Sequence, residues 1–139
     1  MTGERWKLRL ENLKRAFVQL EKACALTEYS DLELAGLVQT YEFTFELCWK
    51  TLKDLLYSEG YDVKSPKETI RKAFELSLID EVDSWFNALE SRNILAHVYN
   101  EQTAKQAMSL IRETFEPMLR KCTASLQERA EKDEQRDDG

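Results

Sequence analysis

The sequence predicts an all-α protein, an up-and-down four-helix bundle with one short extra helix. Two observations support this prediction. Apolar residues recur at alternating spacings of three and four along most of the chain, the period of helices that pack in bundles. Glycine and proline, which tight turns require, number only four and two in 139 residues. Because the apolar stripes carry several large aromatic residues that one chain need not bury completely, we also expect a homodimer.

The first two helices are expected at residues 4–26 and from Ser30 to about Glu59. Ser30 and Glu33 have the spacing of a capping box, and Gly60 supplies a left-handed residue at the end of the second helix. The apolar stripe of the first helix comprises Trp6, Leu10, Leu13, Phe17, Leu20 and Cys24. The stripe of the second comprises Leu34, Val38, Tyr41, Phe45, Cys48, Leu52 and Leu55.

The remaining helices have equally clear start signals. A short helix begins at Ser65-Pro66-Lys67-Glu68, a second capping box with proline in the first turn, and ends near Leu76. A fourth opens near Asp80. Asn100 can cap a fifth, which Pro117 should bend because proline lacks a backbone donor. The stripe of this last helix is Ala104, Met108, Ile111, Phe115, Met118, Cys122 and Leu126.

Residues 1–127 are therefore expected to form the bundle domain, and residues 128–139 an acidic, disordered tail. The formal net charge is -6, and the tail contributes half of it. Broad, non-specific nucleic-acid binding is not expected, because it requires clustered cations, although a local basic site is compatible with this charge. With no signal peptide and no apolar run that could span a bilayer, we expect a cytoplasmic protein without membrane contact.

The three cysteines are interpreted as buried thiols rather than disulfides or metal ligands, since all three lie on apolar helical stripes. The sequence contains no glycine-rich phosphate loop, no Cys/His metal spacing and no Gly-x-Ser-x-Gly nucleophile. It also lacks the Gly-Ser pair followed by Asp-x-Asp of a minimal nucleotidyltransferase. We therefore predict no metal and no cofactor.

The candidate site is the segment from Arg92 to Tyr99, which contains His97, the only histidine. Histidine transfers protons near neutral pH, arginine binds phosphate, and a phenol can position a phosphate or accept a nucleotidyl group. Together they suit phosphodiester cleavage without a metal. A five-residue step turns about 140° around a helix. Arg92 and His97 therefore converge only if the helix ends between them or a second chain contributes.

A structural role for the same residues is the alternative. One helical stripe with spacings of four and three would place Tyr99 partly in the bundle and let Arg92 pair with Glu90 or Glu101. That stripe consists of Trp85, Leu89, Arg92, Ala96 and Tyr99.

A second polar stripe lies on the second helix, where Glu42, Glu46 and Lys50 recur every four residues, beside Trp49. These residues are interpreted either as a solvated face with Glu–Lys pairs or as a groove wall or partner surface. A smaller basic cluster surrounds the short helix and consists of Lys64, Lys67, Arg71 and Lys72. It could hold a phosphate, but a solvated face is the simpler interpretation.

Three stretches give the chain a family resemblance. They are Tyr41-Glu-Phe-Thr-Phe-Glu-Leu-Cys-Trp-Lys-Thr-Leu-Lys53, Ser65-Pro-Lys-Glu-Thr-Ile-Arg-Lys-Ala-Phe74 and Ser91-Arg-Asn-Ile-Leu-Ala-His-Val-Tyr99. In this order they resemble the nucleotidyltransferase substrate-binding protein family, a branch close to the HepT-like toxins of the HEPN superfamily. The last stretch fits the HEPN motif Arg-x4-His, extended by x-Tyr.

The resemblance implies a homodimeric bundle that works with a separate minimal nucleotidyltransferase of the MntA kind, as in a toxin–antitoxin pair. In one form the bundle is a metal-independent RNase with Arg92 and His97 as catalytic residues, and the nucleotidyltransferase adds AMP to Tyr99. In the other form it is a non-catalytic, substrate-binding subunit of the nucleotidyltransferase. RNA is a substrate only in the first form. Glu42, Glu46, Trp49 and Lys50 match the family's second-helix signature without an assigned role.

Overall fold

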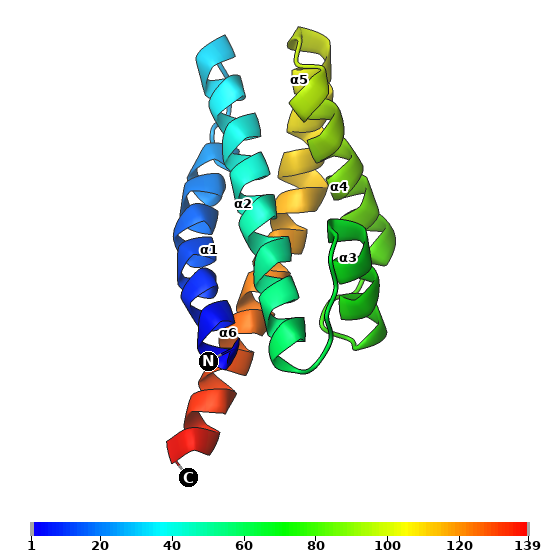
Figure 1. Ribbon diagram of the computed structural model, residues 1–139. Helices are drawn as coiled ribbons and strands as arrows, with labels where there is room; N and C mark the ends of the chain where they lie inside the picture. The colour runs from blue at the N-terminus through cyan, green and yellow to red at the C-terminus, as the bar shows by residue number, and fades with distance from the viewer. Residues whose placement is uncertain (1, 139) are drawn as a thin grey trace.

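The protein is an all-helical, up-and-down bundle, as predicted, in a computed structural model that describes residues 2–138 (Figure 1). The long helices are α1 (Thr2–Cys24), α2 (Asp31–Ser58), α4 (Val82–His97) and the continuous unit formed by α5 (Glu101–Leu110), η1 (Ile111–Phe115) and α6 (Glu116–Asp138). The short extra helix is α3 (Pro66–Glu75), which packs beside α4. No strand occurs within the described residues.

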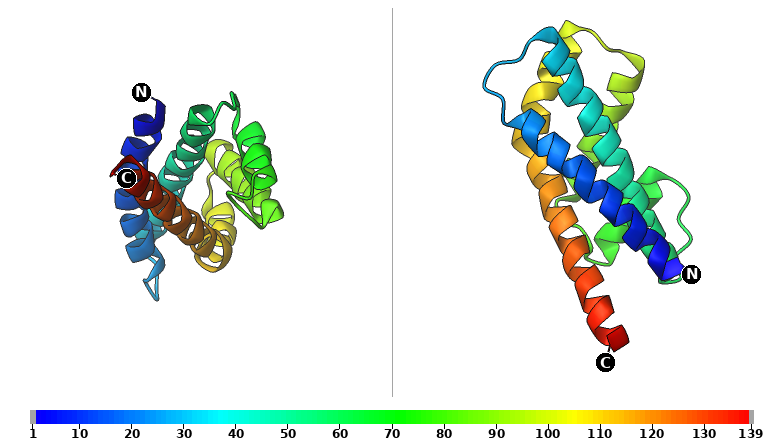
Figure 2. Two further views of the ribbon diagram at one scale, coloured as in Figure 1. Left: turned by 90° about the horizontal axis from the view of Figure 1, so that it is seen from below. Right: turned by 90° about the vertical axis from the view of Figure 1, so that its left-hand side faces the viewer.

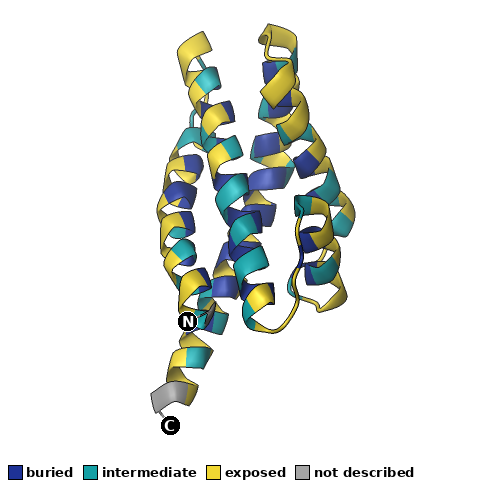
Figure 3. Ribbon diagram, in the orientation of Figure 1, coloured by how far each residue is buried: buried dark blue, intermediate teal, exposed yellow. Residues whose placement is uncertain are grey.

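The core forms where the predicted apolar stripes meet in the middle of the bundle (Figure 3). Tyr41 of α2 stacks on Phe115 of η1 with ring centroids 5.4 Å apart, and Phe45 lies 6.1 Å from Trp85 of α4. The Tyr41 hydroxyl donates a hydrogen bond of 2.6 Å to the Ala88 carbonyl, which satisfies a polar group in the core. These contacts join α2 to α4 from the inside.

Most helix boundaries agree with the capping signals. Ser30 and Glu33 form the expected capping box, Asn100 caps α5, and Gly60 has a φ of 95°, which suits glycine. The Ser65 cap differs in one detail. Its hydroxyl accepts from the Glu68 amide, but the Glu68 carboxylate accepts from the Lys64 amide at 3.1 Å rather than from Ser65.

Pro117 lies two residues after the end of a single turn of π-helix, η1, where the Glu116 amide donates to the Ile111 carbonyl. The wider turn adjusts the hydrogen-bond ladder just before the residue that cannot donate to it. From η1, Arg112 donates to the carbonyls of Cys24 at 3.2 Å and Leu26 at 3.1 Å. It thereby ties the end of α1 to the middle of the last long helix.

In the part of residues 128–139 that the structure describes, α6 continues to Asp138 and extends past the other helices (Figure 2). The expected boundary between a bundle domain and an acidic tail stays a prediction. Ala130 is still buried, Arg129 pairs with Glu59, and Lys7 lies 3.9 Å from Asp133. These contacts with α1 and the end of α2 replace the apolar stripe that ends at Leu126 in the sequence.

All three cysteines are free thiols. Cys48 and Cys122 are buried with their sulfurs 3.6 Å apart, as expected for core residues. Cys24 is only partly buried, at the end of α1. Burial raises its pKa to about 11, so the thiol stays protonated near neutral pH.

Candidate functional site

The segment Arg92–Tyr99 lies at the carboxyl end of α4, which runs unbroken to His97 and ends at Val98, an extended residue with φ of -132°. Leu95 is buried and anchors this last turn. Because the helix does not end between Arg92 and His97, the two side chains leave α4 in directions about 140° apart. Within one chain they do not converge.

Arg92 faces α2, where its Nη2 donates to Glu46 Oε2 at 2.9 Å. The same oxygen accepts from the indole nitrogen of Trp49 at 3.0 Å, and Lys50 Nζ lies 3.1 Å from Glu46 Oε1. The alternative partners Glu90 and Glu101 do not pair with Arg92 within the described residues. Glu46 therefore joins the second-helix stripe to the candidate site, through an arginine whose side chain remains about one-third exposed at 32%.

Two carboxylates on this face of α2 have pKa values that shift in opposite directions. Partial burial would raise the pKa of Glu46, but hydrogen bonds from Trp49 and Lys50, with the charges of Arg92 and Lys50, lower it overall. Burial raises the pKa of Glu42, and the charge of Arg92 offsets this only partly. Glu46 is consequently the ionised partner that fixes the Arg92 guanidinium.

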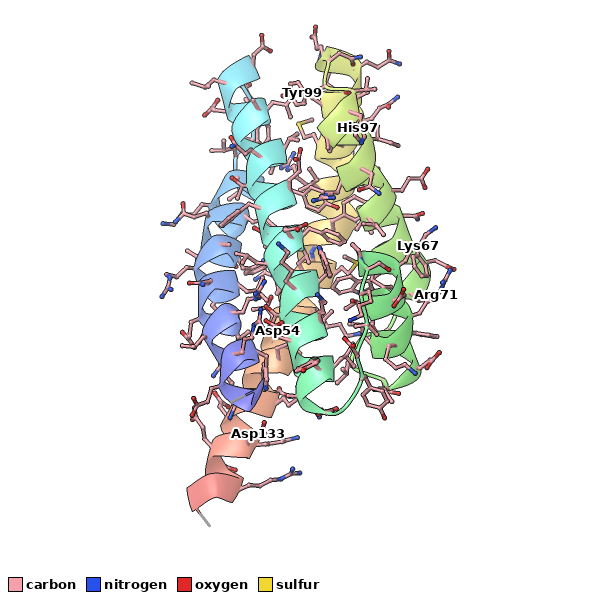
Figure 4. All side chains as sticks on the ribbon, in the orientation of Figure 1. Asp54, Lys67, Arg71, His97, Tyr99 and Asp133 are labelled. Atoms are coloured by element: carbon pink, nitrogen blue, oxygen red, sulfur yellow. The ribbon has the colours of Figure 1, made fainter. Side chains whose placement is uncertain are left out.

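His97 lies on another side of α4 and is exposed. It lines a groove of about 630 Å³ between α3 and α4, together with Lys67 and Arg71. Figure 4 shows Lys67 and Arg71 on α3, with His97 further along α4 towards the opposite end of the bundle. The imidazole is thus free to approach a ligand, which a buried structural histidine would not be.

Tyr99 lies beyond the end of α4, in the short link before the Asn100 cap, and is 51% exposed. The helical stripe that would bury it does not continue this far. Trp85 and Leu89 are buried, whereas Ala96 is exposed and Tyr99 is no longer helical. The phenol is therefore accessible to a second protein.

The sequence places Arg92, His97 and Tyr99 on one segment but does not indicate which residues are their neighbours in space. The ion pair between Glu46 and Arg92 joins residues 46 positions apart, and periodicity carries no signal for it. Lys67 and Arg71 had a weak signal, since they are one helical turn apart on α3 and share a face. Only the packing of α3 on α4 shows that this face meets His97.

Two further features of the described part of the chain bear on the site. No group of three or more histidine, cysteine or acidic side chains there has an arrangement that could hold a metal ion. None of the helices in residues 2–138 combines the length and apolar character that crossing a membrane requires.

Comparison with known proteins finds a matching family, a curated relative and solved structures that resemble this chain. The family described as "Nucleotidyltransferase substrate binding protein like" matches residues 8–128. "Probable ribonuclease HepT" of Haemophilus influenzae is 27% identical in an alignment of 114 residues, and the match covers 70% of this chain and 78% of that protein. A crystal structure of a Thermus thermophilus protein superposes with a TM-score of 0.71 at 28% identity, covering 84% of this chain and 97% of the other.

Proposed function

The chain belongs to the nucleotidyltransferase substrate-binding protein-like family, and from this premise we propose that it is a metal-independent RNase whose site combines residues of two copies. The similarity to a protein named as a probable ribonuclease supports this activity. The observation that carries it is the exposed end of α4, where Arg92 is held by Glu46 and His97 is accessible.

The chemistry follows from the groups present. A histidine acting as base removes the proton of a ribose 2′-hydroxyl, whose oxygen then attacks the adjacent phosphorus. The bond from phosphorus to the 5′ oxygen breaks, and an acid protonates that oxygen. The products are a 2′,3′-cyclic phosphate and a free 5′-hydroxyl. Arg92 stabilises the negative charge that develops on the phosphate oxygens.

Two copies are needed for this reaction because one chain offers one histidine for two proton transfers. A homodimer brings two His97 side chains together and lets Arg92 of one copy approach His97 of the other. Glu46 keeps Arg92 oriented, and since it accepts from three donors it is a positioning residue rather than a proton-transfer group.

The test is RNA cleavage by purified protein in the presence of EDTA. His97→Ala should abolish cleavage while the melting temperature stays unchanged, because His97 is exposed. Lys105→Ala, which removes an exposed cation on α5 that pairs with Glu101, is the matched control and should cleave normally. Cleavage that persists in His97→Ala would overturn the proposal.

We further propose that a separate minimal nucleotidyltransferase regulates the protein by modifying Tyr99. The phenolic oxygen of Tyr99 attacks the α-phosphorus of ATP, a new phosphate ester forms, and pyrophosphate leaves. The half-exposed position of Tyr99 outside the helix supports this role. Mass spectrometry after co-expression should find one added AMP on Tyr99, and none in Tyr99→Phe. An unmodified Tyr99 beside an active partner would contradict it.

A non-catalytic subunit of such a nucleotidyltransferase is the second candidate. The net charge of -6 and the pairing of Arg92 with a carboxylate favour a protein-binding surface over an avid RNA binder. This candidate predicts a complex that survives gel filtration at micromolar concentration, and no cleavage by either component. Glu42→Ala and Lys50→Ala should weaken that complex if this face of α2 makes the contact.

A further inference from the structure

The groove between α3 and α4 has an apolar floor that is open to solvent. Its floor contains Phe86, Leu89, Ile94 and Val98. Ile94 is 47% exposed and Val98 is 51% exposed, although both are large apolar residues. His97 stands between them in the sequence and lines the same groove. An exposed apolar surface beside a titratable group is a common property of ligand sites.

The cations around this groove differ from their neighbours in having no acidic partner. Lys64 pairs with Asp62 at 2.9 Å, and Lys72 pairs with Glu75 at 2.8 Å. Lys67 and Arg71, which line the groove, have no carboxylate oxygen within 4.0 Å among the described residues. Among these four cations around α3, the two that face the groove are therefore the ones without an acidic partner within the described residues.

The local charge of the groove opposes that of the protein. Glu90 is the single acid among the lining residues, so Lys67 and Arg71 leave the lining with a charge of +1 when His97 is neutral, whereas the chain carries -6. The Arg71 guanidinium lies 5.9 Å from the centre of the Phe86 ring, so its position over the floor is defined by the protein before any ligand arrives.

We propose that this groove binds one nucleotide of a single-stranded RNA, next to the phosphate that is cut. The proposal rests on the proposed ribonuclease function. Lys67 and Arg71 bind the phosphate of this nucleotide, and its base packs on the apolar floor formed by Ile94 and Val98. His97 at the end of the groove then meets the neighbouring phosphate. A cationic groove combined with side chains on which bases stack, usually aromatic ones, is how sequence-tolerant proteins hold a single strand, and Phe86 is the aromatic residue of this lining.

The test measures binding of a fluorescent, fully 2′-O-methylated RNA oligonucleotide, which lacks the attacking hydroxyl and cannot be cleaved by this chemistry. Lys67→Ala with Arg71→Ala should weaken binding by about tenfold and reduce the dependence of log Kd on log salt by about 0.7 for each lost phosphate contact. Lys64→Ala with Lys72→Ala removes the same charge from the same region outside the groove. It should leave the affinity within about twofold, because net charge alone contributes little.

Two further measurements test whether a nucleotide, rather than another ligand or a second copy, occupies the groove. An oligonucleotide with abasic residues should bind at least about fivefold more weakly than the intact one, because stacking and apolar contact with a base are lost. Equal affinity would overturn the assignment of the floor to a base. Gel filtration with light scattering should give the same mass for wild type and for Lys67→Ala with Arg71→Ala. A change of mass would assign the groove to a second copy instead and overturn the proposal.

Cleavage of unmodified RNA separates the failure of this proposal from failure of the ribonuclease function. If wild type cuts RNA and the variant at Lys67 and Arg71 cuts as fast at low substrate concentration, the groove proposal is wrong and the function stands. If wild type cuts nothing but binds the methylated strand through Lys67 and Arg71, the groove stands and the nuclease function is wrong.

Discussion

The apolar stripe of α1 and the carboxyl end of α4 differ in how far their apolar residues are buried. On the side built by α1, α2 and α6, the stripe of α1 is buried, and Trp6, Leu10 and Leu13 are at most 1% exposed. On the side built by α3 and α4, Ile94 and Val98 stay about half exposed at 47% and 51%. Since burial of apolar surface is the main source of stability, α1 and its neighbours stabilise the fold. The end of α4 keeps its side chains available for contacts.

Ion pairs join helices on both sides. On the α1 side, Arg9 lies 2.8 Å from Asp54 of α2, and Lys7 lies 3.9 Å from Asp133 of α6. Figure 4 labels the two aspartates. The pair of Arg92 with Glu46 joins α4 to α2 in the same way, but its arginine belongs to the proposed site.

Substitution of a buried residue should have the largest effect, a loss in the free energy of unfolding. Trp6→Ala should lower the free energy of unfolding by about 3–5 kcal/mol, because it leaves a cavity in a packed core. Ile94→Ser on the groove floor should change it by less than about 0.5 kcal/mol. Guanidinium unfolding followed by circular dichroism measures both. Similar losses for both variants would mean that the two sides do not differ in this way.

Arg112→Leu tests whether a polar contact between η1 and the end of α1 stabilises the fold. It removes two hydrogen bonds from a charged donor to the carbonyls of Cys24 and Leu26, and we expect a loss of about 2 kcal/mol in unfolding free energy. RNA cleavage per folded molecule should not change. Arg112→Lys, which keeps the charge but not the paired geometry, should recover only part of the loss. A loss of RNA cleavage in a fully folded Arg112→Leu protein would contradict the assignment of Arg112 to the fold rather than to the site.

Glu46→Gln tests the site side. The amide keeps the size of the side chain but loses the charge that orients Arg92, so cleavage should fall by about tenfold to a hundredfold, the value of a hydrogen bond to a charged group. The melting temperature should change little, since partly exposed ion pairs contribute little to stability. Glu46→Asp, with a shorter carboxylate, should retain more activity. An unchanged kcat in Glu46→Gln would show that Glu46 does not position Arg92 for cleavage.

The smallest expected effect is the pH dependence of the stability that the ion pair between Glu46 and Arg92 contributes. Because the pKa of Glu46 is lowered in the folded protein, its charge stabilises the fold above the pKa of the unfolded chain, about 4.3. That contribution is lost as the pH falls through the lowered folded value. The difference in unfolding free energy between wild type and Glu46→Gln should therefore narrow below about pH 4. A difference in unfolding free energy that widens in acid would contradict the expected direction of this pH dependence.

The fold was predictable because its determinants are local. Spacings of three and four gave the helices, and Ser30, Ser65 and Asn100 marked their starts within one or two residues. Composition was less informative in residues 128–138, whose polar sequence gave no sign of the packing of Ala130 or of the pairing of Arg129 with Glu59. The π-turn before Pro117 was also not predicted, because proline indicates a bend but not this type of turn.

The site was predictable as a segment but not as a geometry. Arg92, His97 and Tyr99 could be selected because their chemistry is concentrated in eight residues. Their orientations depend on how far α4 extends, and neither a glycine nor a proline lies between Arg92 and His97 to mark its end. Glu46, Lys67 and Arg71 come from other helices, so only the packed structure reveals them as neighbours.

The unbroken course of α4 to His97 has a consequence for how much protein the proposed activity needs. With Arg92 and His97 facing apart on one helix, a site shared between copies exists only in paired chains. At concentrations below the dissociation constant of the pair, the rate of RNA cleavage should rise with the square of the protein concentration, and above it in direct proportion. Dilution would then switch the activity off in molecules that remain fully folded, and expression level would set a threshold for it.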